Sequence, residues 1–122
     1  MRKLIVFTAL TALICVPAAF AKERNLTLAG KPSATKAGKA WTATVSVTID
    51  KEPQAGRAPT IRLINQSIST AARVVNISAR PTSELGVYRA RVAFPSAGTW
   101  RVVVVDTVTG RAYSFGRTSV RR

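Results

Sequence analysis

Four arginines occupy positions from which a side chain can meet an anion. They are Arg62, Arg89, Arg91 and Arg101. Each lies between apolar residues in a stretch whose polarity alternates with a period of two, as in a half-buried strand. Successive side chains of a strand point to opposite faces, so these arginines should face solvent while their neighbours face a core. A guanidinium group binds phosphate, sulfate or carboxylate through directed hydrogen bonds, and these four are therefore the candidate anion-binding residues.

The sequence offers few of the side chains from which metal and catalytic sites are usually built. It contains no histidine, and its single cysteine, Cys15, and single methionine, Met1, lie in the first 21 residues. Copper, zinc and iron sites are built mainly from His, Cys and Met side chains. We therefore expect a domain without a cofactor, without a metal site and without enzymatic activity.

Two short patterns could carry chemistry, and we interpret both as loop. Asp50 and Glu52 are near neighbours, but they flank Lys51 in a turn-rich stretch, which favours a solvated loop over a calcium site. Ser33 to Lys36 fits the S-x-x-K pattern of serine enzymes. That pattern needs a helix to bring serine and lysine together within a large domain, and this stretch is loop-like.

The first 21 residues have the form of a secretory signal peptide. Arg2 and Lys3 precede an apolar run from Leu4 to Val16, Pro17 ends it, and Ala19-Phe20-Ala21 supplies small residues for cleavage. The run is too short to span a bilayer comfortably. We expect a cleaved, secreted or periplasmic cell-envelope protein without a transmembrane helix in its mature chain, held together by its core and not by disulfides.

The charge of the chain points to anionic partners without identifying one. The 122 residues include 19 Lys and Arg against 5 Asp and Glu, which gives a net charge of +14. Nucleic acid is the usual partner of a basic domain, but an exported protein meets anionic lipid headgroups, wall polymers and acidic glycans first. A membrane surface, another anionic envelope component or a partner protein is therefore expected before nucleic acid. The alternative is that the charge only keeps an apolar-rich domain in solution.

Short strands separated by turn residues account for most of the remaining chain. They are expected at 25–29, 41–49, 60–65, 73–78, 87–94, 99–106 and 111–117. No stretch has a convincing helical period, so the pattern predicts an all-β, immunoglobulin-like antiparallel β-sandwich of about seven strands. We expect the signal peptide at 1–21, a leader at 22–39, the sandwich at 40–117 and a basic tail at 118–122. Aromatic residues at inward positions are expected in the core.

Two segments resemble the YtkA-like domains of bacterial envelope proteins. One is the run from Gly86 to Trp100, which reads G-V-Y-R-A-R-V-x-F-P-x-x-G-x-W, and the other is Ala37 to Thr42. The resemblance implies an immunoglobulin-type sandwich related to CopC-like copper carriers, although the His and Met ligands of those carriers have no counterpart here. It implies that Pro95 to Gly98 is a corner between two sheets and that Trp100 is buried. It favours an envelope binding or accessory module with affinity for anionic partners, and the alternative is a periplasmic copper-handling accessory protein.

The signal-peptide pattern predicts that the exported protein begins at Lys22. Signal peptidase should cut after Ala21, because small residues occupy the positions it recognises there. Intact-mass measurement of the secreted protein checks the prediction. A secreted form that still carries residues 1–21 would contradict it.

Overall fold

The computed structural model describes residues 24–70 and 73–122. The expected signal peptide and its cleavage site lie outside these residues. Ten strands follow one another along the described chain. They are β1 (Arg24–Ala29), β2 (Ala34–Lys36), β3 (Trp41–Ile49), β4 (Glu52–Pro53), β5 (Thr60–Asn65), β6 (Val74–Ser78), β7 (Arg80–Pro81), β8 (Val87–Val92), β9 (Gly98–Val105) and β10 (Ala112–Arg121).

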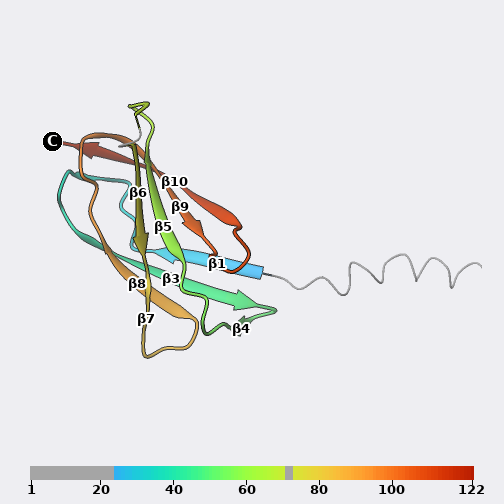
Figure 1. The fold of residues 1–122 in the computed structure, drawn as a ribbon. Helices are drawn as coiled ribbons and strands as arrows, with labels where there is room; N and C mark the ends of the chain where they lie inside the picture. The colour runs from blue at the N-terminus through green and yellow to red at the C-terminus, as the bar shows by residue number, and fades with distance from the viewer. Residues whose placement is uncertain (1–23, 71–72) are drawn as a thin grey trace, which may run out of the picture.

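The strands form two sheets that pack face to face (Figure 1). Sheet A has the order β1-β3-β8-β7, with β4 paired to the end of β3, and sheet B has the order β2-β10-β9-β5-β6. All pairs are antiparallel except β2 with β10. The chain is an all-β, immunoglobulin-like sandwich, as the alternating polarity predicted. Strands β3, β5 and β8 bury alternate residues and leave those between them more exposed, which is the arrangement that a period of two encodes.

The core lies between the two sheets and is built from inward side chains of β1, β3, β5, β8, β9 and β10. In β3 every second residue is buried, from Ala43 to Val47, while Thr44 and Ser46 between them are more exposed. The other core residues include Leu26, Ile61, Leu63, Tyr88, Val92, Phe94, Trp100, Val102 and Val104. β9 is the central strand of sheet B, and it buries Val103 on its outer face as well. Apolar residues on both faces are typical of a strand in the middle of a sheet.

The chain passes from sheet A to sheet B between β8 and β9. Trp100 is fully buried beyond this crossing, and its indole N–H donates a hydrogen bond of 2.8 Å to the carbonyl oxygen of Ser96. Phe94 packs between Trp41 and Trp100, with ring centroids 6.0 and 5.7 Å away. The predictions that Pro95 to Gly98 forms a corner and that Trp100 is buried are both confirmed.

Gly98 is required at this corner for two reasons. Its φ of 137° is a conformation that side chains with a Cβ rarely adopt. A Cβ added there would lie 2.8 Å from Oδ1 of Asn65, a residue that is itself only 1% exposed. Asn65 is held by its amide, which donates to the carbonyl of Ala97, and by its Oδ1, which accepts from the backbone N–H of Ser67. The corner is thus closed by hydrogen bonds as well as by aromatic packing.

The sandwich extends further at both ends than the expected 40–117. β1 and β2 lie within the stretch 22–39 that the sequence suggested as a leader, and β10 continues to Arg121, through the stretch 118–122 expected as a tail. The cause at the C-terminal end is a β-bulge between Ser114 and Arg117, where Gly116 has a φ of 86°. A bulge shifts the alternation by one residue, so Thr118 and Val120 turn inward and are buried.

The short strands β2, β4 and β7 were not expected, because two or three residues are too few to show a period. Among residues 24–70 and 73–122, no helix has the length and apolar character needed to cross a bilayer.

Replacing Trp100 by alanine tests the corner. The substitution should lower the free energy of unfolding by about 3–5 kcal/mol, as truncation of a fully buried aromatic side chain does. Trp100→Phe should cost less, because it keeps much of the packing and loses mainly the hydrogen bond to Ser96. Chemical denaturation of the two variants and the parent provides the measurement. An alanine variant as stable as the parent would show that the corner does not depend on this side chain.

Candidate functional site

Arg89 and Arg91 project from the outer face of sheet A. Both are exposed, and they alternate along β8 with the buried residues Tyr88, Ala90 and Val92. On β3 they lie opposite Thr44 and Thr42, and on β7 the residue opposite Arg89 is Arg80. This outer face therefore combines arginines with threonine hydroxyls.

Arg62 and Arg101 project from the outer face of sheet B, on β5 and β9. Arg62 lies opposite Val103 and Arg101 lies opposite Ile64, so the two arginines are diagonal neighbours. The Arg62 Nε–H donates a hydrogen bond of 3.0 Å to Asn76 Oδ1. The arrangement places Arg62 beside Arg101, but on the opposite side of the molecule from Arg89 and Arg91.

The structure adds three cations to the sheet B face that alternation alone did not assign. Arg117 on β10 lies directly opposite Arg101, and Lys36 on β2 lies directly opposite Arg121. Arg117 reaches this face because of the bulge in β10, without which the alternation from Tyr113 would turn it inward. The glycine at 116 was the only available sign of such a bulge, because an isolated glycine within a strand pattern often marks one.

Acidic side chains are almost absent from the strands that carry these cations. Among the described strands, only β4 holds an acidic residue, Glu52, and it pairs with Ile49, five residues along β3 from the partner of Arg89. The other described acidic residues, Asp50, Glu84 and Asp106, lie in turns and loops. The cations of both faces are therefore not neutralised by cross-strand partners.

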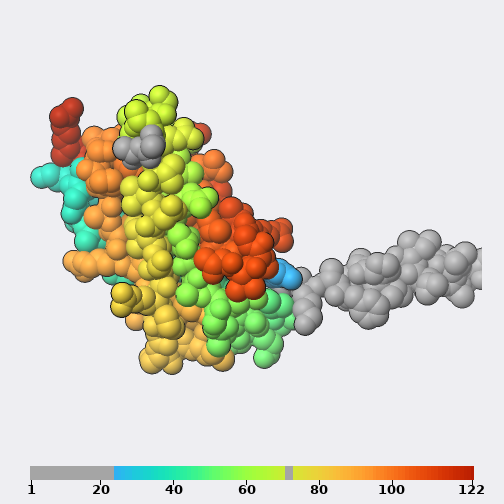
Figure 2. Space-filling model, viewed as in Figure 1, coloured from blue at the N-terminus to red at the C-terminus, as the bar shows by residue number. Residues whose placement is uncertain are grey.

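Figure 2 shows part of this surface. Residues of β5 and β6, in green and yellow, lie in the middle of the side turned to the viewer, and the turn joining β9 to β10 lies beside them in orange-red. The exposed Val74 on β6 lies opposite Ile64, so apolar side chains stand among the cations of sheet B. The face offers charge and some apolar area.

An open hollow of about 530 Å³ lies at the end of the sandwich near the C-terminus. It is lined by Ala37, Asn65, Ile68, Ser96, Ala97 and Arg122. Of the described residues that line it, only Arg122 is charged, and the Asn65 amide donates to the carbonyl of Ala97 in the corner. The hollow thus brings together no set of groups that could act on a ligand.

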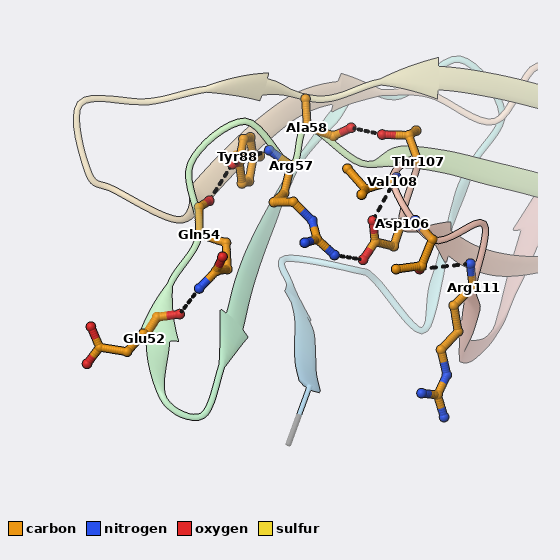
Figure 3. Close-up of polar contacts among 10 residues, drawn as sticks. Glu52, Gln54, Arg57, Ala58, Tyr88, Asp106, Thr107, Val108 and Arg111 are labelled. Atoms are coloured by element: carbon orange, nitrogen blue, oxygen red, sulfur yellow. Dashed lines mark hydrogen bonds and ion pairs between the residues drawn. The ribbon is translucent and has the colours of Figure 1, made fainter. Parts of the chain in front are cut away.

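A polar cluster at the opposite end holds the loop before β5 against two other parts of the chain (Figure 3). Arg57 and Asp106 form an ion pair with 2.6 Å between Nη2 and Oδ2. The Tyr88 hydroxyl donates to the carbonyl of Gln54 and accepts from the backbone N–H of Arg57 at 3.0 Å. The Arg57 Nε–H is buried and has no hydrogen-bond partner. These contacts fasten a loop, and the Arg57 side chain is largely buried within them.

Asp106 also organises the turn that follows β9. Its Oδ1 accepts hydrogen bonds from the backbone N–H groups of Val108 and Thr109, at 2.9 and 3.4 Å. Burial by itself raises the pKa of Asp106, but the hydrogen bond and charge of Arg57 and the two backbone N–H groups outweigh it, so the pKa is below its ordinary value. The carboxylate is therefore a structural anchor that works in its ionised form.

Neither of the two loop patterns forms a reactive site. Ser33 directly precedes the extended strand β2, which contains Lys36, and side chains three residues apart on a strand point to opposite faces. Asp50 and Lys51 occupy a turn with positive φ angles of 51° and 68°. Among the described residues, no group of three or more His, Cys, Asp or Glu could hold a metal ion.

Comparison with known proteins finds likeness in fold only. No protein-family model matches the sequence, and no curated protein matches it. A superoxide reductase (neelaredoxin) variant from Ignicoccus hospitalis matches with a TM-score of 0.52 at 13% identity, over 99% of this chain and 100% of its own. Another structure of that reductase has a TM-score of 0.52 at 12% identity, over 88% of this chain and 86% of its own.

A third solved structure has a slightly lower TM-score. The CARDB domain of a Pyrococcus furiosus protein, in complex with di-metal ions, has a TM-score of 0.48 at 15% identity, over 82% of this chain and 94% of its own. The two reductase matches, with TM-scores of 0.52, indicate a shared fold, and at 12–13% identity they transfer no activity or ligand to this chain.

These matches overturn the expectation that the chain is not an enzyme. That expectation rested on the scarcity of the side chains from which metal and catalytic sites are usually built. Superoxide reductases are enzymes, and they share this fold over nearly the whole of the chain. The fold therefore does not argue against catalysis, and activity has to be judged from the site.

Acid should destabilise the protein through Asp106. Because the pKa of this carboxyl is lower in the folded state, its contribution is fully present above the ordinary pKa of about 4 and is lost as the pH falls below that value. Asp106→Asn should lower the free energy of unfolding by about 1.5–3 kcal/mol at neutral pH, as loss of a charge-assisted hydrogen bond does.

The measurement is thermal unfolding of both forms between pH 7 and pH 3. The stability difference between parent and Asp106→Asn should shrink as the pH falls. Glu84→Gln, which changes an exposed carboxyl in the same way, serves as the control and should track the parent. A difference that is unchanged at low pH would contradict the assigned role of the carboxylate.

Proposed function

We propose that this protein is an exported, YtkA-like domain of the cell envelope that binds anionic partners through arginines spread over both outer faces of its sandwich. The observation that carries the proposal is the placement of Arg89 and Arg91 on sheet A, and of Arg62 and Arg101 on sheet B, on strands without acidic partners. The pattern of residues 1–21 supports export.

Spread charge of this kind attracts anions without selecting a shape. At physiological salt the Debye length is about 8 Å, so the attraction is short in range and falls as salt is added. The four arginines are divided between two opposite faces, so they cannot clamp a single small ligand. The binding supported by this layout is weak, salt-sensitive and directed at surfaces that carry many anionic groups.

Vesicle binding tests the proposal. The parent, Arg89→Ser/Arg91→Ser and Arg62→Ser/Arg101→Ser are compared on phosphatidylcholine vesicles with and without phosphatidylglycerol. Each double substitution should weaken binding to the anionic vesicles only in part, because the other face remains. Binding by all three should fade as salt rises past the physiological range, and none should bind the uncharged vesicles.

Two results would count against the proposal. If one double substitution abolished binding and the other had no effect, the site would be focused on one face. If no form bound in a salt-dependent way, the charge would serve only to keep the domain in solution.

A further inference from the structure

The cations of the two faces meet like charges across the strands, which is unfavourable for the isolated domain. Arg101 lies directly opposite Arg117 in sheet B, and Arg80 lies directly opposite Arg89 in sheet A. Like charges at directly opposed positions of a sheet are destabilising. The salt bridge between Arg57 and Asp106 involves neither pair, and no carboxylate lies directly opposite any of these four arginines on the neighbouring strands. An anionic group bound between two such guanidiniums would remove the repulsion on that face.

The two arginine pairs cannot be served by one partner surface. They project from opposite sides of a two-layer sandwich, whose sheets are about 10 Å apart before the side chains are added. This separation already exceeds the Debye length of about 8 Å at physiological salt. Neutralising one face therefore leaves the positive charge of the other face almost unchanged.

The layout on sheet B fits a flat partner. Arg62, Arg101 and Arg117 lie on three neighbouring strands, so they are spread in two dimensions and do not follow a line. The partly exposed Ile64 and the exposed Val74 stand beside them. A bilayer rich in anionic phospholipid offers mobile phosphate groups in a plane, with apolar area just beneath them.

We propose that one copy of this domain bridges two anionic bilayer surfaces, with sheet A facing one and sheet B facing the other. The proposal rests on the function proposed above and adds a geometry to it. Each face supplies an opposed arginine pair with one further arginine, which are Arg80, Arg89 and Arg91 on sheet A and Arg62, Arg101 and Arg117 on sheet B. The lipid phosphates are the groups that these guanidiniums bind.

Vesicle clustering separates bridging from simple binding. Phosphatidylcholine vesicles containing phosphatidylglycerol are mixed with the protein, bound protein is measured by co-sedimentation, and clustering is measured by dynamic light scattering. The parent should cluster the vesicles at low coverage. At equal amounts of bound protein, Arg80→Ser/Arg89→Ser/Arg91→Ser and Arg62→Ser/Arg101→Ser/Arg117→Ser should both lose most of the clustering.

A control variant removes the same charge without touching either arginine set. Arg24, Lys39 and Arg122 are exposed, and the variant Arg24→Ser/Lys39→Ser/Arg122→Ser should cluster vesicles like the parent at equal coverage. Lysine at the three positions of each face keeps the charge and should retain clustering. Thermal unfolding confirms that every variant is folded before it is compared.

The possible failures are distinguishable. Variants lacking one face that still cluster vesicles would overturn bridging by a single copy and would indicate that the domain self-associates. A parent that binds anionic vesicles without clustering them would overturn bridging and leave the proposed function standing. A folded parent that binds no anionic vesicles would overturn both.

Discussion

The distribution of charge over this protein depends on the closure of the corner between β8 and β9. The buried indole of Trp100 packs on Phe94 and donates to the carbonyl of Ser96, and so holds the chain where it leaves sheet A and enters sheet B. If the same residues formed a hairpin, Arg89, Arg91 and Arg101 would share one face as a focused site. Because the chain crosses instead, the arginines before and after the corner point away from each other, and the surface has two cationic sides.

The opposite end of the sandwich is held by polar contacts. Arg57 and Asp106 tie the loop before β5 to the turn after β9, and the Tyr88 hydroxyl ties the same loop to β8. Tyr88 thus contributes its ring to the core and its hydroxyl to the loop, as buried tyrosines usually do. A domain without a disulfide among its described residues is fastened at one end by aromatic packing and at the other by charge-assisted hydrogen bonds. Strands β8 and β9, which carry Arg89, Arg91 and Arg101, run between these two ends.

The like-charged pairs conflict with the rest of the design. Opposed arginines weaken a sheet, and a sequence selected for stability alone would place a carboxylate or a polar residue at one of the two positions. Departures from local consistency of this kind tend to occur where function requires them. Superoxide reductases have a similar fold, so the fold is compatible with more than one function. The function of this chain has to be judged from the residues on its surface.

The sequence by itself determined which residues face inward wherever alternation is regular. In 41–49 and 87–92 the period of two is unbroken, and the buried and exposed residues follow it, as do the outward positions of Arg89 and Arg91. Only the tertiary structure decided the orientation of Arg117, because the bulge at Gly116 shifts the alternation. It also decided that Arg80 lies opposite Arg89, because that position depends on pairing between strands. The sequence also did not predict β2, because its three residues form a strand through parallel pairing with β10. Periodicity is a local property of the chain, whereas register and bulges are settled by hydrogen bonds between segments that are distant in sequence.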